Sequence, residues 1–348
     1  MTGLVTARAL RSTGLGWDPV RGDRFVIPDR DMDADVFVLS DMTIEAHEFP
    51  TGRVLGFNGT TEWALDSVGA EQAVWLPHEG QLRALLGEAF VRLERRGRAW
   101  AVTTERPAGP HTPLHATAHT GLDAAVRTTL HATVDPDVEE AYALALLAVR
   151  ARTALQLLPV AVHDLRVRLH ALDAPAWGLQ VAVRGGSLRD LALRSAAEQR
   201  SVVELLAGRT VDPAGSPPRR GEEAAAADPA AVWDDAVRAS LAAWVAADPG
   251  DPVPLVTGPV TVAEYAEQAL LDLVLAAWDV ARASRQDEHL DPAAVRHVLA
   301  HLRPRAAQWS EVGILAPPVD LGAPGAPGAA DEPDEQEELL ALTGRDPR

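Results

Sequence analysis

Two acidic residues within an apolar segment are the first candidates for chemistry. The stretch LLDLVLAAWDVARA, residues 270–283, is apolar at most positions but contains Asp272, Trp278 and Asp279. A buried carboxylate is costly without a partner, so both acids require one. On a helix Asp272 shares a face with position 276, one turn later, where a histidine would complete an acid–imidazole pair for a metal ion. The chain has Ala276 at that position.

Two other histidine patterns could bind a metal ion. His111, His115 and His119 recur every four residues, but prolines and a glycine interrupt the segment and indicate a loop. His297 and His301 are also four residues apart, within a more convincing helical pattern. They could hold a surface ion weakly, because two ligands alone rarely form a functional site.

Neither a catalytic triad nor a calcium loop is well supported. Ser40, Asp41 and His47 are the residue types of a triad, but no G-x-S-x-G motif accompanies them. The acidic turn at residues 29–35 lacks the central glycine and the terminal glutamate of a calcium loop. We expect a solvated turn there.

The pattern of residues 1–151 predicts a small α+β domain. Pro50 to Gly52 favours a hairpin. A helical face is expected over 78–94, and Asp135, as N-cap before Pro136, predicts a closing helix over 135–152. Short β-branched or alternating runs predict strands at 24–28, 35–40, 43–49, 53–58, 74–77 and 96–104.

Residues 152–348 are helical in pattern and predict an all-α domain, an up-down four-helix bundle followed by a shorter helix. Ser187 and Asp228 are expected at helix starts, and Gly208 at a helix end. The segments 209–227 and 320–336 are rich in Pro, Gly, Ala and acids, and we expect them to be mobile. Apolar stripes at helical spacing predict helices at 154–172, 187–208, 229–246, 261–284 and 291–303.

Composition excludes several functions. A length of 348 residues favours two domains, and a net charge of −18 argues against nucleic-acid or anionic-membrane partners. No cysteine is available for a disulfide, a thiolate nucleophile or a Cys-type zinc site, and no lysine for a P-loop. No signal peptide and no membrane span of about 18 apolar residues is evident, so we expect a cytoplasmic protein.

Three stretches of the helical half resemble the DinB / mycothiol-dependent maleylpyruvate isomerase superfamily, in its actinobacterial metal-binding branch. They are SLRDLALRSAAEQRSVVELLAG, LLDLVLAAWDVARASRQDEHLDP, and GILAPPVDL together with EQEELLALTGRDP. The resemblance covers roughly residues 152–348 and implies a DinB-like four-helix bundle. It also implies a divalent metal, such as zinc, held by two histidines and one acid, with mycothiol as a thiol cofactor.

The resemblance places the metal ligands at three positions. Asp272 matches the acid, whereas Arg194 and Ala276 occupy the positions of the two histidines. We expect a degenerate site in which Arg194 pairs with Asp272, because a guanidinium can fork onto a carboxylate. There are two alternatives. Either Asp272 is solvated, or a metal site is formed with other ligands. Further candidate pocket-lining residues are Glu198, Trp278, Asp279 and Arg282.

In the N-terminal half, GDRFVIPDRDMDADVFVLSDM and FNGTTEWALDSV resemble an actinobacterial domain family often labelled pilus-assembly-related. The leading hypothesis is a non-catalytic protein that binds a small ligand or a protein partner and needs no cofactor. One alternative is a metal-dependent, mycothiol-using isomerase or transferase with non-standard ligands. Another is a scaffold associated with pilus assembly.

Overall fold

The computed structural model describes most of the chain as two compact units. One unit comprises Met1–Glu105 with Ala132–Arg150, and the other Arg106–His131 with Ala151–Arg348. The expected boundary after residue 151 lies beside this division, but Arg106–His131 groups with the second unit, where the His131 imidazole lies 3.5 Å from the Asp291 carboxylate. The described residues are 1–28, 35–40, 44–50, 52–57, 67–107, 128–183, 185–211, 228–321 and 333–348.

The N-terminal part is built from small antiparallel sheets and helices, which confirms the predicted mixture of α and β structure. Three sheets have the strand orders β2-β1-β6, β3-β4-β5 and β7-β8-β9. Phe25, Ile27 and Leu55 are fully buried in the core beneath the first two. The strands are β1 (Arg24–Val26), β2 (Phe37–Val38), β3 (Ile44–Phe49), β4 (Gly52–Phe57), β5 (Ser67–Gly69), β6 (Val74–Leu76), β7 (Phe90–Arg96), β8 (Ala99–Pro107) and β9 (Thr128–Asp135).

One predicted helix in this part is too long, and another helix was not predicted. The helix expected over 78–94 is α2 (Glu79–Leu86), and a strand, β7, follows it. Gly87 has φ +52°, a conformation that ends the helix, and the alternating residues after it pair with β8 instead. The structure also contains helix α1 (Leu4–Ser12), which the sequence patterns did not indicate.

Helix α3 (Val138–Arg150) begins later than expected. The side chain of Asp137, not Asp135, accepts hydrogen bonds from the first helical N–H groups, those of Glu139 at 2.9 Å and Glu140 at 3.3 Å. Asp135 accepts from the backbone N–H of Asp137 at 2.6 Å, so it shapes the turn before the helix. β9 extends through Asp135, which moves the helix start to the second acid.

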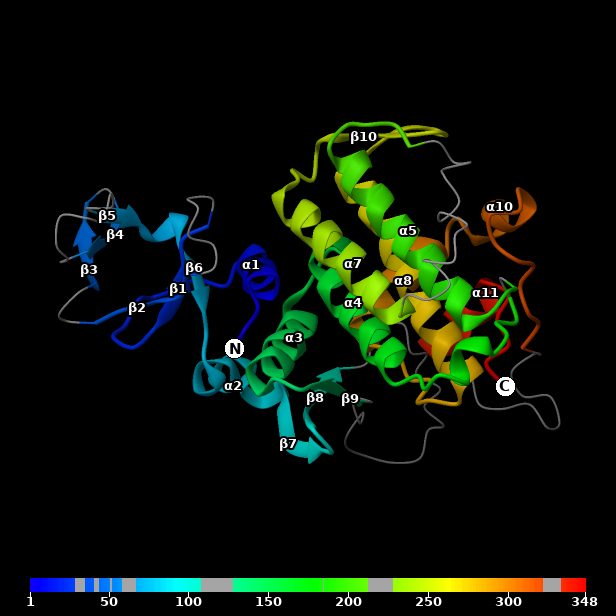
Figure 1. The fold of residues 1–348 in the computed structure, drawn as a ribbon, viewed down its shortest axis with the longest axis horizontal. Helices are drawn as coiled ribbons and strands as arrows, with labels where there is room; N and C mark the ends of the chain where they lie inside the picture. The colour runs from blue at the N-terminus through cyan, green and yellow to red at the C-terminus, as the bar shows by residue number, and fades with distance from the viewer. Residues whose placement is uncertain are drawn as a thin grey trace, which may run out of the picture. The chain divides into compact units, whose positions relative to one another are not determined.

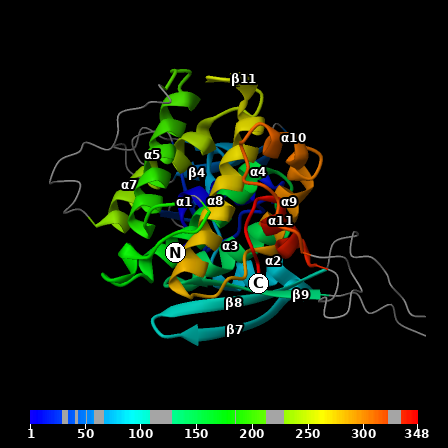
Figure 2. The ribbon, with the colours of Figure 1, turned by 90° about the vertical axis from the view of Figure 1, so that its right-hand side faces the viewer.

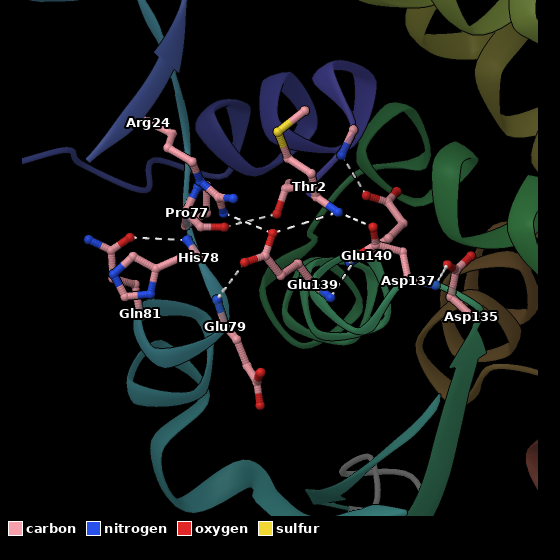
Figure 3. Close-up of polar contacts among 12 residues, drawn as sticks. Thr2, Arg24, Pro77, His78, Glu79, Gln81, Asp135, Asp137, Glu139 and Glu140 are labelled. Carbon is pink, nitrogen blue, oxygen red and sulfur yellow. Dashed lines mark hydrogen bonds and ion pairs between the residues drawn. The ribbon is translucent and has the colours of Figure 1, made fainter. Parts of the chain in front are cut away.

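The two glutamates at the start of α3 connect it to the rest of the N-terminal unit (Figure 3). Glu140 accepts hydrogen bonds from the Gly3 backbone N–H at 2.6 Å and from the Thr6 hydroxyl on α1. Burial raises the pKa of Glu140, although these two donors oppose the shift. Glu139 accepts from the Arg24 guanidinium at 2.8 Å and from the Glu79 backbone N–H at 3.3 Å. This network ties α1, β1 and α2 to one helix end.

Four helices of the second unit run side by side (Figures 1 and 2). Helix α5 packs along α7 and α4 along α8, and contacts of α4 with α7 and of α5 with α8 complete the group. Trp233 and Leu270 are fully buried within it. The helices are α4 (Ala154–His170), α5 (Leu188–Leu206), α7 (Pro229–Ala246) and α8 (Val262–Ser284), followed by α9 (Pro292–Leu302), α10 (Ala306–Glu311) and α11 (Glu335–Leu342).

The predicted helix ends in this unit are confirmed. The Ser187 and Asp228 side chains accept from backbone N–H groups at the starts of α5 and α7, and Gly208 follows α5 with φ +74°. The prediction of an all-α domain is wrong in one respect. Strands β10 (Pro252–Leu255) and β11 (Gly258–Thr261) form a hairpin before α8, made possible by Gly258 at φ +120°.

Several expectations fall outside the described residues. They concern His111, His115 and His119, Asp41, and most of the acidic turn at 29–35, of which only Asp35 is described. The greater parts of 209–227 and 320–336 also lie outside. In the part of the chain that the structure describes, no helix combines the length and the apolar character needed to cross a membrane.

Candidate functional site

Asp272 lies on α8 and belongs to a group of acidic and aromatic residues. Its side chain is half-buried. Glu198, from α5, and Asp272 both act through their charge on Tyr265, which lies two helical turns before Asp272. Burial raises the pKa of the Tyr265 phenol, and the charges of Glu198 and Asp272 raise it further. The ring of Tyr265 packs against the buried indole of Trp244 on α7, with a centroid distance of 5.3 Å.

Arg194 and Ala276 occupy the two positions where the resemblance expects histidines. Arg194 is exposed, and its guanidinium donates a hydrogen bond of 3.4 Å to the backbone carbonyl of Gly185, before the start of α5. Its charge also lowers the pKa of Asp190, a shift caused first by hydrogen bonds from Ser187. Arg194 thus bonds to the Gly185 carbonyl, and the expected pairing of Arg194 with Asp272 stays a prediction.

Asp279 and Arg282, candidate pocket residues in the sequence, contact the end of the chain instead. Both oxygens of Asp279 accept hydrogen bonds from the Arg345 guanidinium, at 2.9 and 2.7 Å. Arg282 lies over the Trp278 ring at 5.1 Å and donates to the backbone carbonyls of Asp346 and Arg348. Asp279 and Arg282 therefore hold the C-terminal segment against α8, and Trp278 supports the Arg282 guanidinium through its ring.

The glycine and arginine of the stretch LTGRDP have separate structural roles. Gly344 has φ +74°, and a Cβ atom there would lie 2.5 Å from the Cβ of Ala316. Only glycine therefore fits the close contact between the segments 313–321 and 339–345. Arg345 follows at once and reaches Asp279. The buried ion pair joins the stretch around Asp279 to the stretch that contains Arg345. The Gly344 contact packs the two parts of that last stretch together.

The loop after α8, with the sequence RQDEHLDP, is held by backbone contacts. Arg168, on α4, donates to the carbonyls of Asp287 and His289, at 3.2 and 2.8 Å. Asp291 accepts from the N–H groups of Ala293 and Ala294 at 2.9 and 3.1 Å and caps α9. Arg168 therefore orders the loop and Asp291 starts the next helix, which is a structural use of the motif.

His297 and His301 lie on one face of α9, as their spacing predicts, and both approach Glu267 of α8. The His297 Nε2 lies 2.9 and 3.0 Å from the two Glu267 oxygens, and the His301 Nδ1 lies 3.6 Å from one of them. Burial lowers the pKa of His301; Glu267 opposes this shift, whereas Arg305 and His297 add to it. Across the described residues, no group of three or more His, Asp or Glu side chains has an arrangement that could hold a metal ion.

Sequence reasoning missed Tyr265, Trp244 and Arg345. Tyr265 precedes Asp272 by seven residues, so the helical period alone places both on one face, and this signal was present. Trp244 and Arg345 come from other elements, and no local pattern links either of them to α8. Of the possible triad residues, Ser40 exchanges backbone hydrogen bonds with Ile44, and His47 lies in β3.

Comparisons with known proteins give no relative. No protein-family model matches the chain, and neither a curated protein nor a solved structure is significantly similar to it. The resemblance to the DinB superfamily therefore stays a prediction from the three quoted stretches.

Proposed function

We propose that this chain is a non-catalytic binding protein whose helical unit is a DinB-like bundle with a degenerate metal site. In this proposal the cluster of Glu198, Trp244, Tyr265 and Asp272, here called the α5–α8 cluster, binds a small organic cation. The observation that carries the proposal is that the charges of acids from two helices both raise the pKa of one tyrosine, near the position where the resemblance expects a metal.

The chemistry of the cluster suits an ammonium group. Two carboxylates supply negative charge, and Asp272 is partly shielded from water, which strengthens its attraction for a cation. The rings of Tyr265 and Trp244 pack together beside these acids. Aromatic faces attract quaternary ammonium groups with about 0.5–2 kcal/mol each. The two histidines that the resemblance implies for a metal ion are replaced here by Arg194 and Ala276.

The remaining acid of the motif supports the same view. Asp279 is 4% exposed and both of its oxygens are bonded to Arg345, so it serves the fold. Asp272, the other acid of the stretch 270–283, is half-buried and takes no part in this pair.

Binding of benzyltrimethylammonium, followed by calorimetry or ligand-observed NMR, tests the proposal. We expect saturable binding to the full chain that weakens by about fivefold or more in Asp272→Asn and in Glu198→Gln, because each removes one charge. Asp235→Asn is the matched control, since Asp235 is an exposed acid on α7 that pairs with Arg238. Its binding should equal that of the unaltered protein.

Metal analysis of the same samples separates this proposal from the enzymatic alternative. A stoichiometric zinc or other divalent ion that is lost in Asp272→Asn would contradict the proposal. It would favour the metal-dependent, thiol-using isomerase or transferase. Equal binding of the cation by Asp272→Asn, Glu198→Gln and the control would also contradict the proposal.

A further inference from the structure

The N-terminal unit contains a cavity of about 210 Å³ between α1 and the segment that includes β6. Its apolar lining includes Leu10, Leu15, Pro77 and the indoles of Trp17 and Trp75, and its polar lining is Arg11 and Glu71. An apolar cavity of about 150 Å³ is large enough to bind benzene. The volume therefore suits one ring with a small substituent.

Two stacked indoles form one wall of the cavity. The rings of Trp17 and Trp75 are nearly parallel, with an interplanar angle of 7° and a centroid distance of 6.4 Å. A ligand ring in the cavity can stack against these indoles in the same offset arrangement.

The wall is also fixed in place before any ligand binds. The Trp17 Nε1 donates a hydrogen bond of 2.8 Å to Asp23, which is only 1% exposed. Asp23 accepts two more bonds, from the Val20 N–H at 2.9 Å and from Gln81 at 2.6 Å, so its own position is held from three sides. The Trp17 ring is further packed against Phe25 at 5.7 Å. A preorganised wall loses little entropy on binding.

The polar lining of the cavity holds one cationic and one anionic side chain. The Arg11 guanidinium donates to the Ala73 carbonyl at 3.3 Å, which keeps it at the cavity. A guanidinium has five N–H donors, so one such bond leaves capacity for a carboxylate. Glu71 also lines the cavity, and its carboxylate lies over Gly69, where a Cβ atom would be 1.9 Å from the oxygen. The negative charge of Glu71 disfavours a ligand with a second negative charge.

We infer that this cavity is a binding site for a small planar aromatic ring that carries one carboxylate. The ring stacks on the Trp17 and Trp75 wall, and the carboxylate accepts hydrogen bonds from Arg11. The site lies within the N-terminal unit and is independent of the α5–α8 cluster, so either proposal can fail without the other.

Benzoate is the probe, with benzamide as its uncharged and cyclohexanecarboxylate as its non-aromatic counterpart. Calorimetry on the full chain should give a dissociation constant for benzoate on the order of 10⁻⁴–10⁻³ M, given nine non-hydrogen atoms. Benzamide and cyclohexanecarboxylate should each bind at least about fivefold more weakly.

Three variants test the placement. Arg11→Gln should weaken benzoate about tenfold and leave benzamide within about twofold, because only the charged contact is removed. Ala70→Leu, which fills the cavity from its lining, should abolish binding of both. Arg98→Gln is the matched control, since Arg98 is an exposed arginine of the same unit that does not line the cavity.

Circular dichroism confirms that each variant is folded. The inference is overturned if benzoate shows no saturable binding below roughly 10 mM. It is equally overturned if Ala70→Leu binds benzoate as well as the Arg98→Gln control, or if cyclohexanecarboxylate binds as tightly as benzoate.

Discussion

The carboxylate of Asp279 and the guanidinium of Arg345 form a two-pronged ion pair between residues 66 positions apart in the chain, and each side chain is 3% exposed. A buried pair of this kind is costly to break, because removal of one partner leaves an uncompensated charge in a region of low dielectric constant. This pair, with Arg282 bonded to the last carbonyls, decides where the C-terminal segment lies on α8.

Asp279→Asn and Arg345→Met should each lower the free energy of unfolding by about 3–5 kcal/mol. The double change Asp279→Leu with Arg345→Leu should cost clearly less than the sum of the single changes, since no charge is then left unpaired. Urea denaturation measures all three.

The exposed pair of Asp235 and Arg238 is the control for this experiment, because its side chains are 75% and 77% exposed. Asp235→Asn should change stability by less than about 0.5 kcal/mol. Equal effects of Asp279→Asn and Asp235→Asn would show that the buried pair does not hold the segment.

The stability of the helical unit should decrease as the pH rises from about 4 to about 7 because of Asp164. Burial raises the pKa of Asp164 to about 6 in the folded protein, above the ordinary value of 3.8, although Arg168 opposes the shift. The folded state therefore binds the proton more tightly than the unfolded state. The contribution of Asp164 to the stability of the folded state is complete below the ordinary pKa. It is lost as the pH rises through about 6.

The resulting decrease in the free energy of unfolding amounts to at most about 3 kcal/mol. Asp164→Asn should remove this part of the pH dependence, as followed by urea denaturation at several pH values. Asp173→Asn, a change of an acid in the turn after α4, should leave it in place. A stability of Asp164→Asn that falls with pH as steeply as that of the unaltered protein would count against this assignment.

Neither tyrosine should ionise near the ordinary pKa of about 10 while the protein is folded. Burial raises the pKa of Tyr142, to which Glu79 adds, and burial with the charges of Glu198 and Asp272 raises the pKa of Tyr265. The chain has only these two tyrosines, so ultraviolet titration of phenolate reports both.

Asp272→Asn should lower the pKa of Tyr265, because it removes one negative charge close to the phenol. Asp235→Asn should not. Phenolate formation with a midpoint near pH 10 and an unchanged circular dichroism spectrum would argue against the α5–α8 cluster as described.

Asp291→Ala should destabilise the protein by about 1–2 kcal/mol, because α9 loses the acceptor for its first N–H groups. Thermal or urea unfolding measures the loss. Asp287→Ala is the control within the same loop, since the Asp287 side chain is exposed and bonds to His289, two residues away. It should cost less than about 0.5 kcal/mol. Similar losses for both changes would contradict the capping role.

Local chemistry made much of the helical unit predictable from sequence. The helix predicted over 229–246 has those bounds in the structure, because Asp228 and Pro229 define its start. Ser187 and Gly208 likewise mark α5. The spacing of His297 and His301 correctly put both on one helix face. Each of these features depends on residues within a turn or two of one another, so the sequence contains the whole cause.

The tertiary structure decided which side chains meet. Gly87 divides one predicted helix into a helix and a strand because β8 is available to pair with β7. Asp279 reaches Arg345, and Glu267 reaches His297, across helices that no local period relates. Trp17 and Trp75 form one wall of a cavity although they belong to separate segments. Helical and strand periods fix the direction of a side chain within its own element, whereas partners on other elements depend on how those elements pack together.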